Sequence, residues 1–149
     1  MSATQVRRIE NVSTPVKLTA RIRLLRVALV VVGLIFLVGI YPLMNILWPA
    51  GWRWNPNQTE YEQMMVGVYA TLGVFLLIAS WNPLQHRSLI WFTVWSSLVH
   101  GGIMAIQAMN MPMEHGHLLG DVPALLLVAV VLAVLMPRGT SAETADTTA

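Results

Sequence analysis

Four long apolar runs divide the chain, and each is long enough to cross a lipid bilayer as a helix. They cover about residues 27–48, 64–81, 89–109 and 118–136. A bilayer core roughly 30 Å thick is spanned by about 20 apolar residues in an α-helix, so runs of this length indicate transmembrane helices. Short segments with turn-forming residues, such as Asn82-Pro83, separate the runs. The pattern predicts an all-α fold, a four-helix transmembrane bundle.

The four spans form one predicted membrane domain, residues 16–137, between two polar tails. The tails, residues 1–15 and 138–149, are rich in small and polar residues, which is typical of disordered segments. The first run is not read as a cleaved signal peptide, whose apolar core is about 7–15 residues long and precedes a small-residue cleavage site. Here the run is longer and ends in Trp48-Pro49.

Two features within the spans predict local structure. Pro42, near the outer end of the first span, predicts a kink or an early end of that helix, because proline lacks the backbone N–H and crowds the preceding turn. The third span has small residues at every fourth position, Ser97, Gly101 and Ala105, and these allow another helix to approach closely. We therefore expect the third helix to be central in the bundle.

The composition agrees with a membrane protein and narrows the chemistry. Of the 149 residues, 56% are hydrophobic and 11% are charged, whereas soluble domains have roughly 25% charged residues. The chain contains no cysteine, which excludes disulfides, thiolate metal sites and thiol catalysis. Its basic residues lie next to the ends of the spans, where attraction to anionic lipid explains them. The lipid bilayer is therefore an expected partner, and nucleic acid is not.

The charged residues sort to opposite ends of the predicted spans. One set of ends is flanked by basic residues: Arg7, Arg8, Lys17, Arg21, Arg23, Arg26, Arg87 and Arg138. The other ends hold Arg53, Glu60, Glu62, Glu114 and Asp121. Lysine and arginine in short loops mark the cytoplasmic side of a membrane protein. We therefore expect a multi-pass protein of the inner (plasma) membrane with both termini in the cytoplasm.

His100 is the strongest single candidate for a functional residue. It lies about 12 residues from the inner end of the third span. Twelve helical residues are about 18 Å long, which places His100 in the outer half of a membrane core about 30 Å thick. An ionisable group at that depth suggests a functional site. A neutral histidine that hydrogen-bonds to a neighbouring helix is the alternative, and the sequence leaves both open.

Other polar residues are expected to converge with His100 at the outer mouth of the bundle. His117 and Asp121 are four residues apart and share a helical face if the fourth helix begins early enough. The full set of candidates for binding a ligand or relaying protons is Glu62, Tyr69, His100, Gln107, His117 and Asp121. Simple capping of helix ends by Glu62 and Asp121 is the alternative.

The third connection contains a pattern that suggests a metal site. Its candidate ligands are Met111, Met113, His115 and His117. Thioether sulfur suits Cu(I), and imidazole suits Cu(II) or zinc. Methionine is frequent throughout the chain, so packing of a methionine-rich loop explains the same residues equally simply.

Several short motifs carry a resemblance to a known family. They read Tyr61-Glu62, Gly67-Val68-Tyr69-Ala70, Gly73-Val74-Phe75, Asn82-Pro83, Ser97-Leu98-Val99-His100 and Gly116-His117-Leu118-Leu119-Gly120-Asp121-Val122-Pro123. Over about residues 25–136 the chain resembles an uncharacterised family of small bacterial four-span integral membrane proteins. The resemblance implies four helices and no particular activity. In size and topology the chain is also loosely similar to DoxX-like membrane proteins, some of which associate with quinone or redox partners.

From these patterns we expect a small, non-enzymatic membrane component that binds a ligand or a partner through its outer polar site. A redox- or metal-handling membrane protein and a small oligomeric transporter remain as alternatives. A homo-oligomer or a complex with another membrane protein is compatible with each of them. The sequence identifies no cofactor.

Overall fold

The computed structural model describes the backbone of residues 3–54 and 59–137, and the side chains of residues 18–54 and 60–137. Within these ranges the chain is helical and has no strand. Four of the described segments are long and apolar enough to cross a membrane: Leu18–Leu47, Glu60–Trp81, Arg87–Asn110 and Pro112–Leu135. The predicted all-α, four-span fold is confirmed, and the protein is a multi-pass membrane protein.

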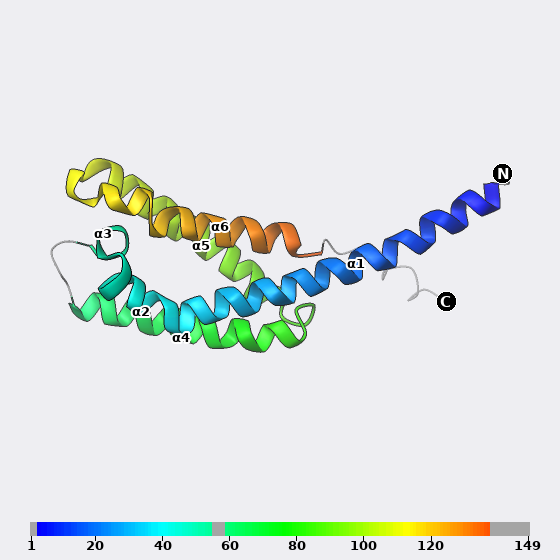
Figure 1. The fold of residues 1–149 in the computed structure, drawn as a ribbon, viewed down its shortest axis with the longest axis horizontal. Coiled ribbons are helices and arrows are strands. Elements are labelled where there is room, and N and C mark those ends of the chain that lie inside the picture. Colours follow the sequence, from blue (N-terminus) through cyan, green and yellow to red (C-terminus); the bar gives the residue numbers. More distant parts are fainter. Residues whose placement is uncertain (1–2, 55–58, 138–149) are drawn as a thin grey trace, which may run out of the picture.

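The bundle consists of two pairs of helices (Figure 1). Helix α1 (Ala3–Leu34) packs along α4 (Thr59–Trp81), and α5 (Arg87–Asn110) packs along α6 (Asp121–Leu135). Contacts between α1 and α6 join the two pairs.

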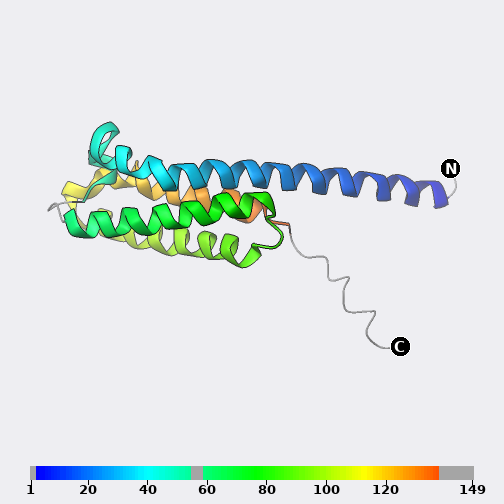
Figure 2. The same cartoon turned by 90° about the horizontal axis from the view of Figure 1, so that it is seen from below.

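The two ends of the bundle differ in what they contain. One end, here called the arginine end, holds the turn at residues 82–86 and the last residue described, Pro137. The other, here called the cluster end, holds α3 (Pro49–Trp52) and the 3₁₀-helix η3 (Pro112–Leu118), which lie against each other. Helix α1 runs past the rest of the bundle at the arginine end (Figures 1 and 2).

The first helix starts earlier than expected. It begins at Ala3, so the backbone of most of the segment predicted as a tail, residues 1–15, is helical. Extending an existing helix costs far less than nucleating one, and a helix that is anchored in the bundle supplies the nucleus. The tail predicted for residues 138–149 lies outside the described residues.

Pro42 does not end the first span, and the chain stays helical on both sides of it. The chain continues from α1 through the π-helical segment η1 (Ile35–Gly39), α2 (Ile40–Pro42) and a second π-helical segment, η2 (Leu43–Leu47). The Trp48 N–H donates to the Leu43 carbonyl over 3.1 Å, five residues back. A wider turn relieves the clash between a proline ring and the preceding carbonyls. The span thus reaches Leu47, close to the predicted end.

Glycines bring α1 and α4 almost into backbone contact. A Cβ atom added at Gly73 would lie 2.6 Å from the Gly33 carbonyl oxygen and 2.7 Å from the Leu37 nitrogen. Real Cβ atoms essentially never come so close to other atoms. Close approach of two helices across small residues is the usual way to gain packing energy inside a membrane.

Helix α5 buries one face and exposes the other. Its small and polar stripe is buried at Thr93, Ser97 and Gly101, and a Cβ atom added at Gly101 would lie 3.4 Å from the Leu125 Cβ atom of α6. The opposite face carries large exposed apolar residues: Phe92, Trp95, Val99, Ile103 and Ile106. The expected close helix contact is present, but the expected central position was wrong, because α5 packs chiefly on α6.

Two arginines cap the end of α6 at the arginine end. The Arg21 guanidinium donates to the carbonyls of Leu135 and Met136, over 3.1 Å each, and to that of Val134. The Arg87 guanidinium donates to the Pro137 carbonyl over 3.0 Å. The last four carbonyls of a helix have no partner within it, and cations are favourable there. These arginines therefore join α1 and α5 to the end of α6.

We expect Arg21→Ala to lower the free energy of unfolding by about 1–2 kcal/mol, since charge-assisted hydrogen bonds to the end of α6 are lost. Arg23→Ala is the matched control, because Arg23 is exposed on the same helix. Denaturant titration of the detergent-solubilised protein measures both. Equal effects of the two substitutions would mean that positive charge alone, and not the contact with α6, matters.

Candidate functional site

The cluster end is held together by two glycines. Gly116 and Gly120 lie against the backbone of α3, and a Cβ atom at either position would overlap a carbonyl oxygen, that of Ala50 or that of Gly51. Glycine is the only residue that permits so close an approach. This close approach of η3 to α3 places Arg53 and Trp54, which follow α3, beside His117 of η3.

His117 is the centre of the site and is fully buried. Its Nδ1 atom lies 2.8 Å from Asp121 Oδ2, the contact that the spacing of four residues predicts. Its Nε2 atom lies 3.3 Å from the Arg53 carbonyl oxygen and 3.3 Å from Glu114 Oε2. The Trp54 ring stacks on the imidazole at a centroid distance of 4.2 Å and an angle of 22°. Both ring nitrogens therefore face oxygen atoms.

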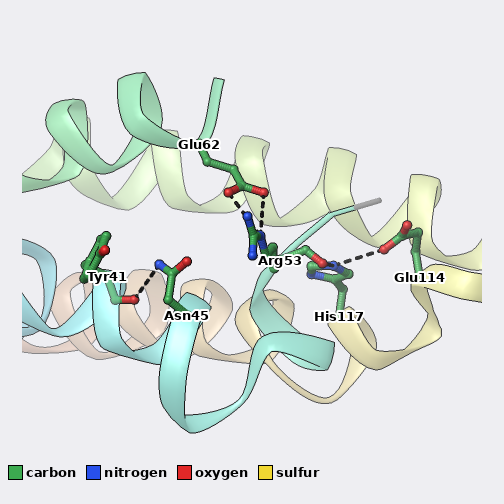
Figure 3. Close-up of polar contacts among 6 residues, drawn as sticks. All are labelled: Tyr41, Asn45, Arg53, Glu62, Glu114 and His117. Atoms are coloured by element: carbon green, nitrogen blue, oxygen red, sulfur yellow. Dashed lines mark hydrogen bonds and ion pairs between the residues drawn. The ribbon is translucent and has the colours of Figure 1, made fainter. Parts of the chain in front are cut away.

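Arg53 joins this site to α4. Its Nε atom lies 3.1 Å and 3.2 Å from the two carboxylate oxygens of Glu62, at the start of α4 (Figure 3). The side chain of Arg53 thus binds Glu62 while its carbonyl oxygen faces His117. We call the connected residues Arg53, Trp54, Glu62, Glu114, His117 and Asp121 the polar cluster.

Negative groups outnumber positive ones in the polar cluster. Arg53 is its only guanidinium or ammonium group, against the carboxyl groups of Glu62, Glu114 and Asp121. Glu114 and Asp121 are 3% and 5% exposed. Because both nitrogens of His117 face oxygens, a neutral imidazole can donate to only one of them. The geometry is satisfied by an imidazolium or by a carboxyl group that retains its proton.

One oxygen of the polar cluster stands out. Asp121 Oδ1 is buried and, among the described residues, has no hydrogen-bond partner. A buried polar atom without a partner is costly, so such atoms are rare in native structures. Asp121 Oδ1 is therefore the atom of the polar cluster that can still accept a hydrogen bond.

Tyr69 and His100 lie next to one another on α4 and α5. Their rings meet edge to face at a centroid distance of 5.9 Å, and Phe36 meets Tyr69 in the same way at 4.9 Å. Tyr69 is within electrostatic range of Asp121. His100 therefore contacts Tyr69 but makes no hydrogen bond or ion pair with a described carboxylate.

Gln107 and three of the four proposed metal ligands are not part of the polar cluster, because their side chains are exposed. Gln107 and His115 are exposed, and Met111 and Met113 are 50% and 82% exposed. His117 is buried instead, with both nitrogens occupied by the contacts above. No group of three or more histidine, aspartate or glutamate residues in the described part of the chain is arranged to hold a metal ion. A copper-like site made by Met111, Met113, His115 and His117 stays a prediction.

A profile of a family of unknown function (DUF6632) matches residues 19–148. The chain belongs to the DUF6632 family. This agrees with the resemblance to an uncharacterised family of four-span membrane proteins, and the match includes every residue of the polar cluster. No curated protein and no solved structure matches this DUF6632 protein.

Sequence reasoning missed three members of the DUF6632 protein's polar cluster: Arg53, Trp54 and Glu114. Arg53 makes contacts to η3 and α4, 64 and 9 residues away in the chain, which no periodicity reveals. A signal was nevertheless present, since Arg53 is the single arginine or lysine at the predicted outer ends of the spans, where the other charged residues, histidines aside, are acidic. An isolated cation on that side suggests an ion pair.

Proposed function

We propose that this protein is a non-enzymatic component of the plasma membrane that binds a small organic cation at the polar cluster. The observation that carries the proposal is the unpartnered, buried Oδ1 atom of Asp121 in a cluster with more carboxyl groups than cations. A buried carboxylate requires a positive partner. An ammonium group supplies both the missing charge and the missing hydrogen-bond donor.

The surrounding aromatic rings favour an organic cation. Trp54 stacks on His117, and Tyr69, whose ring contacts that of Phe36, lies within electrostatic range of Asp121. Cations with attached carbon atoms are attracted to aromatic faces as well as to carboxylates. This combination suits an alkylammonium group better than a strongly hydrated inorganic ion.

A thermal-shift titration of the detergent-purified protein with n-butylammonium chloride tests the binding proposal. A ligand that binds only the folded state raises the unfolding midpoint as its concentration increases. We expect a saturable rise with butylammonium, no rise with the same concentration of NaCl, and loss of the rise in Asp121→Asn. Glu60→Gln is the matched control, because Glu60 is an exposed acid on α4 near Glu62. The proposal fails if no saturable rise occurs, or if Asp121→Asn responds like the control.

We further propose that the arginine end faces the cytoplasm and the cluster end faces outward. Arg21, Arg23, Arg26 and Arg87 lie toward one end, and the acidic groups of the polar cluster lie toward the other. Such a bias in arginine sets orientation in the plasma membrane.

The absence of cysteine makes this orientation directly testable. Met113, 82% exposed at the cluster end, and Gln85, exposed in the turn at the arginine end, are matched sites for single cysteines. In intact cells, a membrane-impermeant maleimide is expected to label Met113→Cys and to label Gln85→Cys only after the membrane is opened. The reverse labelling pattern would show that the cluster end faces the cytoplasm, and would contradict the proposed orientation.

A further inference from the structure

A groove at the arginine end of the bundle is separate from the polar cluster and from the candidate metal ligands. It has a volume of about 420 Å³ and lies between α1 and α4. Its lining consists of Arg26, Val27, Val30, Val31, Ser80 and Trp81. The groove thus combines an apolar wall with a single cationic side chain.

The position of the groove follows from the glycine crossing. Gly33 and Gly73 bring α1 and α4 together, and Arg26 and Ser80 each lie seven residues from that point, toward the arginine end. Seven helical residues correspond to about 10 Å. The groove therefore opens where the two helices leave their closest contact.

The cation of the groove is available for a ligand. Arg21 and Arg87 are occupied by the carbonyls at the end of α6. Arg26 is exposed and has no hydrogen-bond or ion-pair partner among the described side chains. It lies five residues beyond Arg21 toward the membrane centre, about 7.5 Å along the helix. A guanidinium there reaches the level of lipid phosphates and binds them with two hydrogen bonds.

The apolar part of the groove fits a hydrocarbon chain. Val27, Val30 and Val31 are 56%, 37% and 49% exposed along one side of α1. Trp81, 83% exposed at the end of α4, is a residue type that prefers the headgroup region. We propose that the groove binds one anionic phospholipid, with its phosphate on Arg26 and an acyl chain along the three valines. Charge complementarity to Arg26 selects the anionic lipid over a zwitterionic one.

Native mass spectrometry of the full chain, in detergent with equimolar phosphatidylglycerol and phosphatidylcholine, tests this proposal. We expect the wild-type protein to retain one phosphatidylglycerol molecule preferentially. In Arg26→Gln the retained fraction is expected to fall about tenfold relative to phosphatidylcholine, the ratio that 1.4 kcal/mol of lost interaction produces. Arg23→Gln, which removes an exposed arginine outside the groove, is expected to bind like the wild type.

A second variant tests the shape of the groove independently of its charge. Val31→Trp fills the groove while it keeps Arg26, and we expect the same loss of phosphatidylglycerol. Equal loss in Arg23→Gln and Arg26→Gln would overturn the proposal, because it would indicate unspecific attraction to basic charge. Unchanged retention in Val31→Trp, or displacement of the lipid by inorganic phosphate alone, would overturn it as well.

Discussion

Replacing His117 by alanine is expected to lower the free energy of unfolding by about 3 kcal/mol or more. The substitution leaves Glu114 and Asp121 buried without the imidazole that lies between them. Leaving a buried polar group without one of its hydrogen-bond partners costs about 1–3 kcal/mol, and more where the group is charged. The lost stack on Trp54 and the space left behind add to that cost.

His115→Ala is the control for this experiment. His115 lies two residues away in the same 3₁₀-helix but is exposed, so its removal changes few contacts. Denaturant titration in mild detergent, followed by helical circular dichroism, compares the two variants. Similar stability of His117→Ala and His115→Ala would show that the polar cluster contributes little to folding.

A double-mutant cycle separates the contact between His117 and Asp121 from the rest of the cluster. Asp121→Asn keeps the side-chain shape and removes the charge. If the 2.8 Å contact couples the two residues, the double variant His117→Ala/Asp121→Asn will be more stable than the sum of the single losses predicts. Strict additivity would contradict a direct interaction between the pair.

The polar cluster explains why the long connection between the first two spans is attached to the bundle. Arg53 contacts Glu62 of α4 through its side chain and His117 of η3 through its carbonyl oxygen. Gly116 and Gly120 let α3 approach closely enough for both contacts. The same residues that order this end of the protein therefore also bring the buried carboxyl groups together, and binding a cation there would further stabilise the arrangement.

Hydropathy was sufficient to predict the four spans, because a bilayer imposes one length on every crossing helix. The contact between His117 and Asp121 was also predictable, since it depends on a spacing of four residues along one local segment. The partners of Arg53 were not, because they lie on two other elements of the bundle. The π-helical turns around Pro42 escaped prediction for a different reason: hydropathy records where a helix is apolar and not how tightly it is wound.

Gln107 illustrates a further limit of sequence patterns. It continues the polar stripe of α5 at helical spacing after His100 and Met104, yet it is exposed whereas Met104 is buried. Helical periodicity tells which residues share a face, but the extent of burial depends on which neighbour covers that face. Near its end, α5 is covered by η3 as well as by α6, and apolar Ala108 is buried there in place of Gln107.

Gly73→Ala is expected to lower the free energy of unfolding by about 3 kcal/mol, at the upper end of the usual cost of overpacking. The added methyl group would meet the Gly33 carbonyl oxygen at 2.6 Å and the Leu37 nitrogen at 2.7 Å. Both atoms belong to the backbone of the first span, so no side-chain rotation relieves the clash. The α1 and α4 helices have to separate along their contact.

Gly67→Ala on the same helix is the matched control, because nothing lies within 4 Å of the position of its Cβ atom. Alanine favours the helix over glycine by up to about 1 kcal/mol, so this variant should be as stable as the wild type or slightly more stable. The comparison holds residue type, helix and substitution constant and changes only the neighbouring backbone. If Gly73→Ala unfolds at the same denaturant concentration as Gly67→Ala, then the first span does not pack against Gly73, and the pairing of α1 with α4 is incorrect.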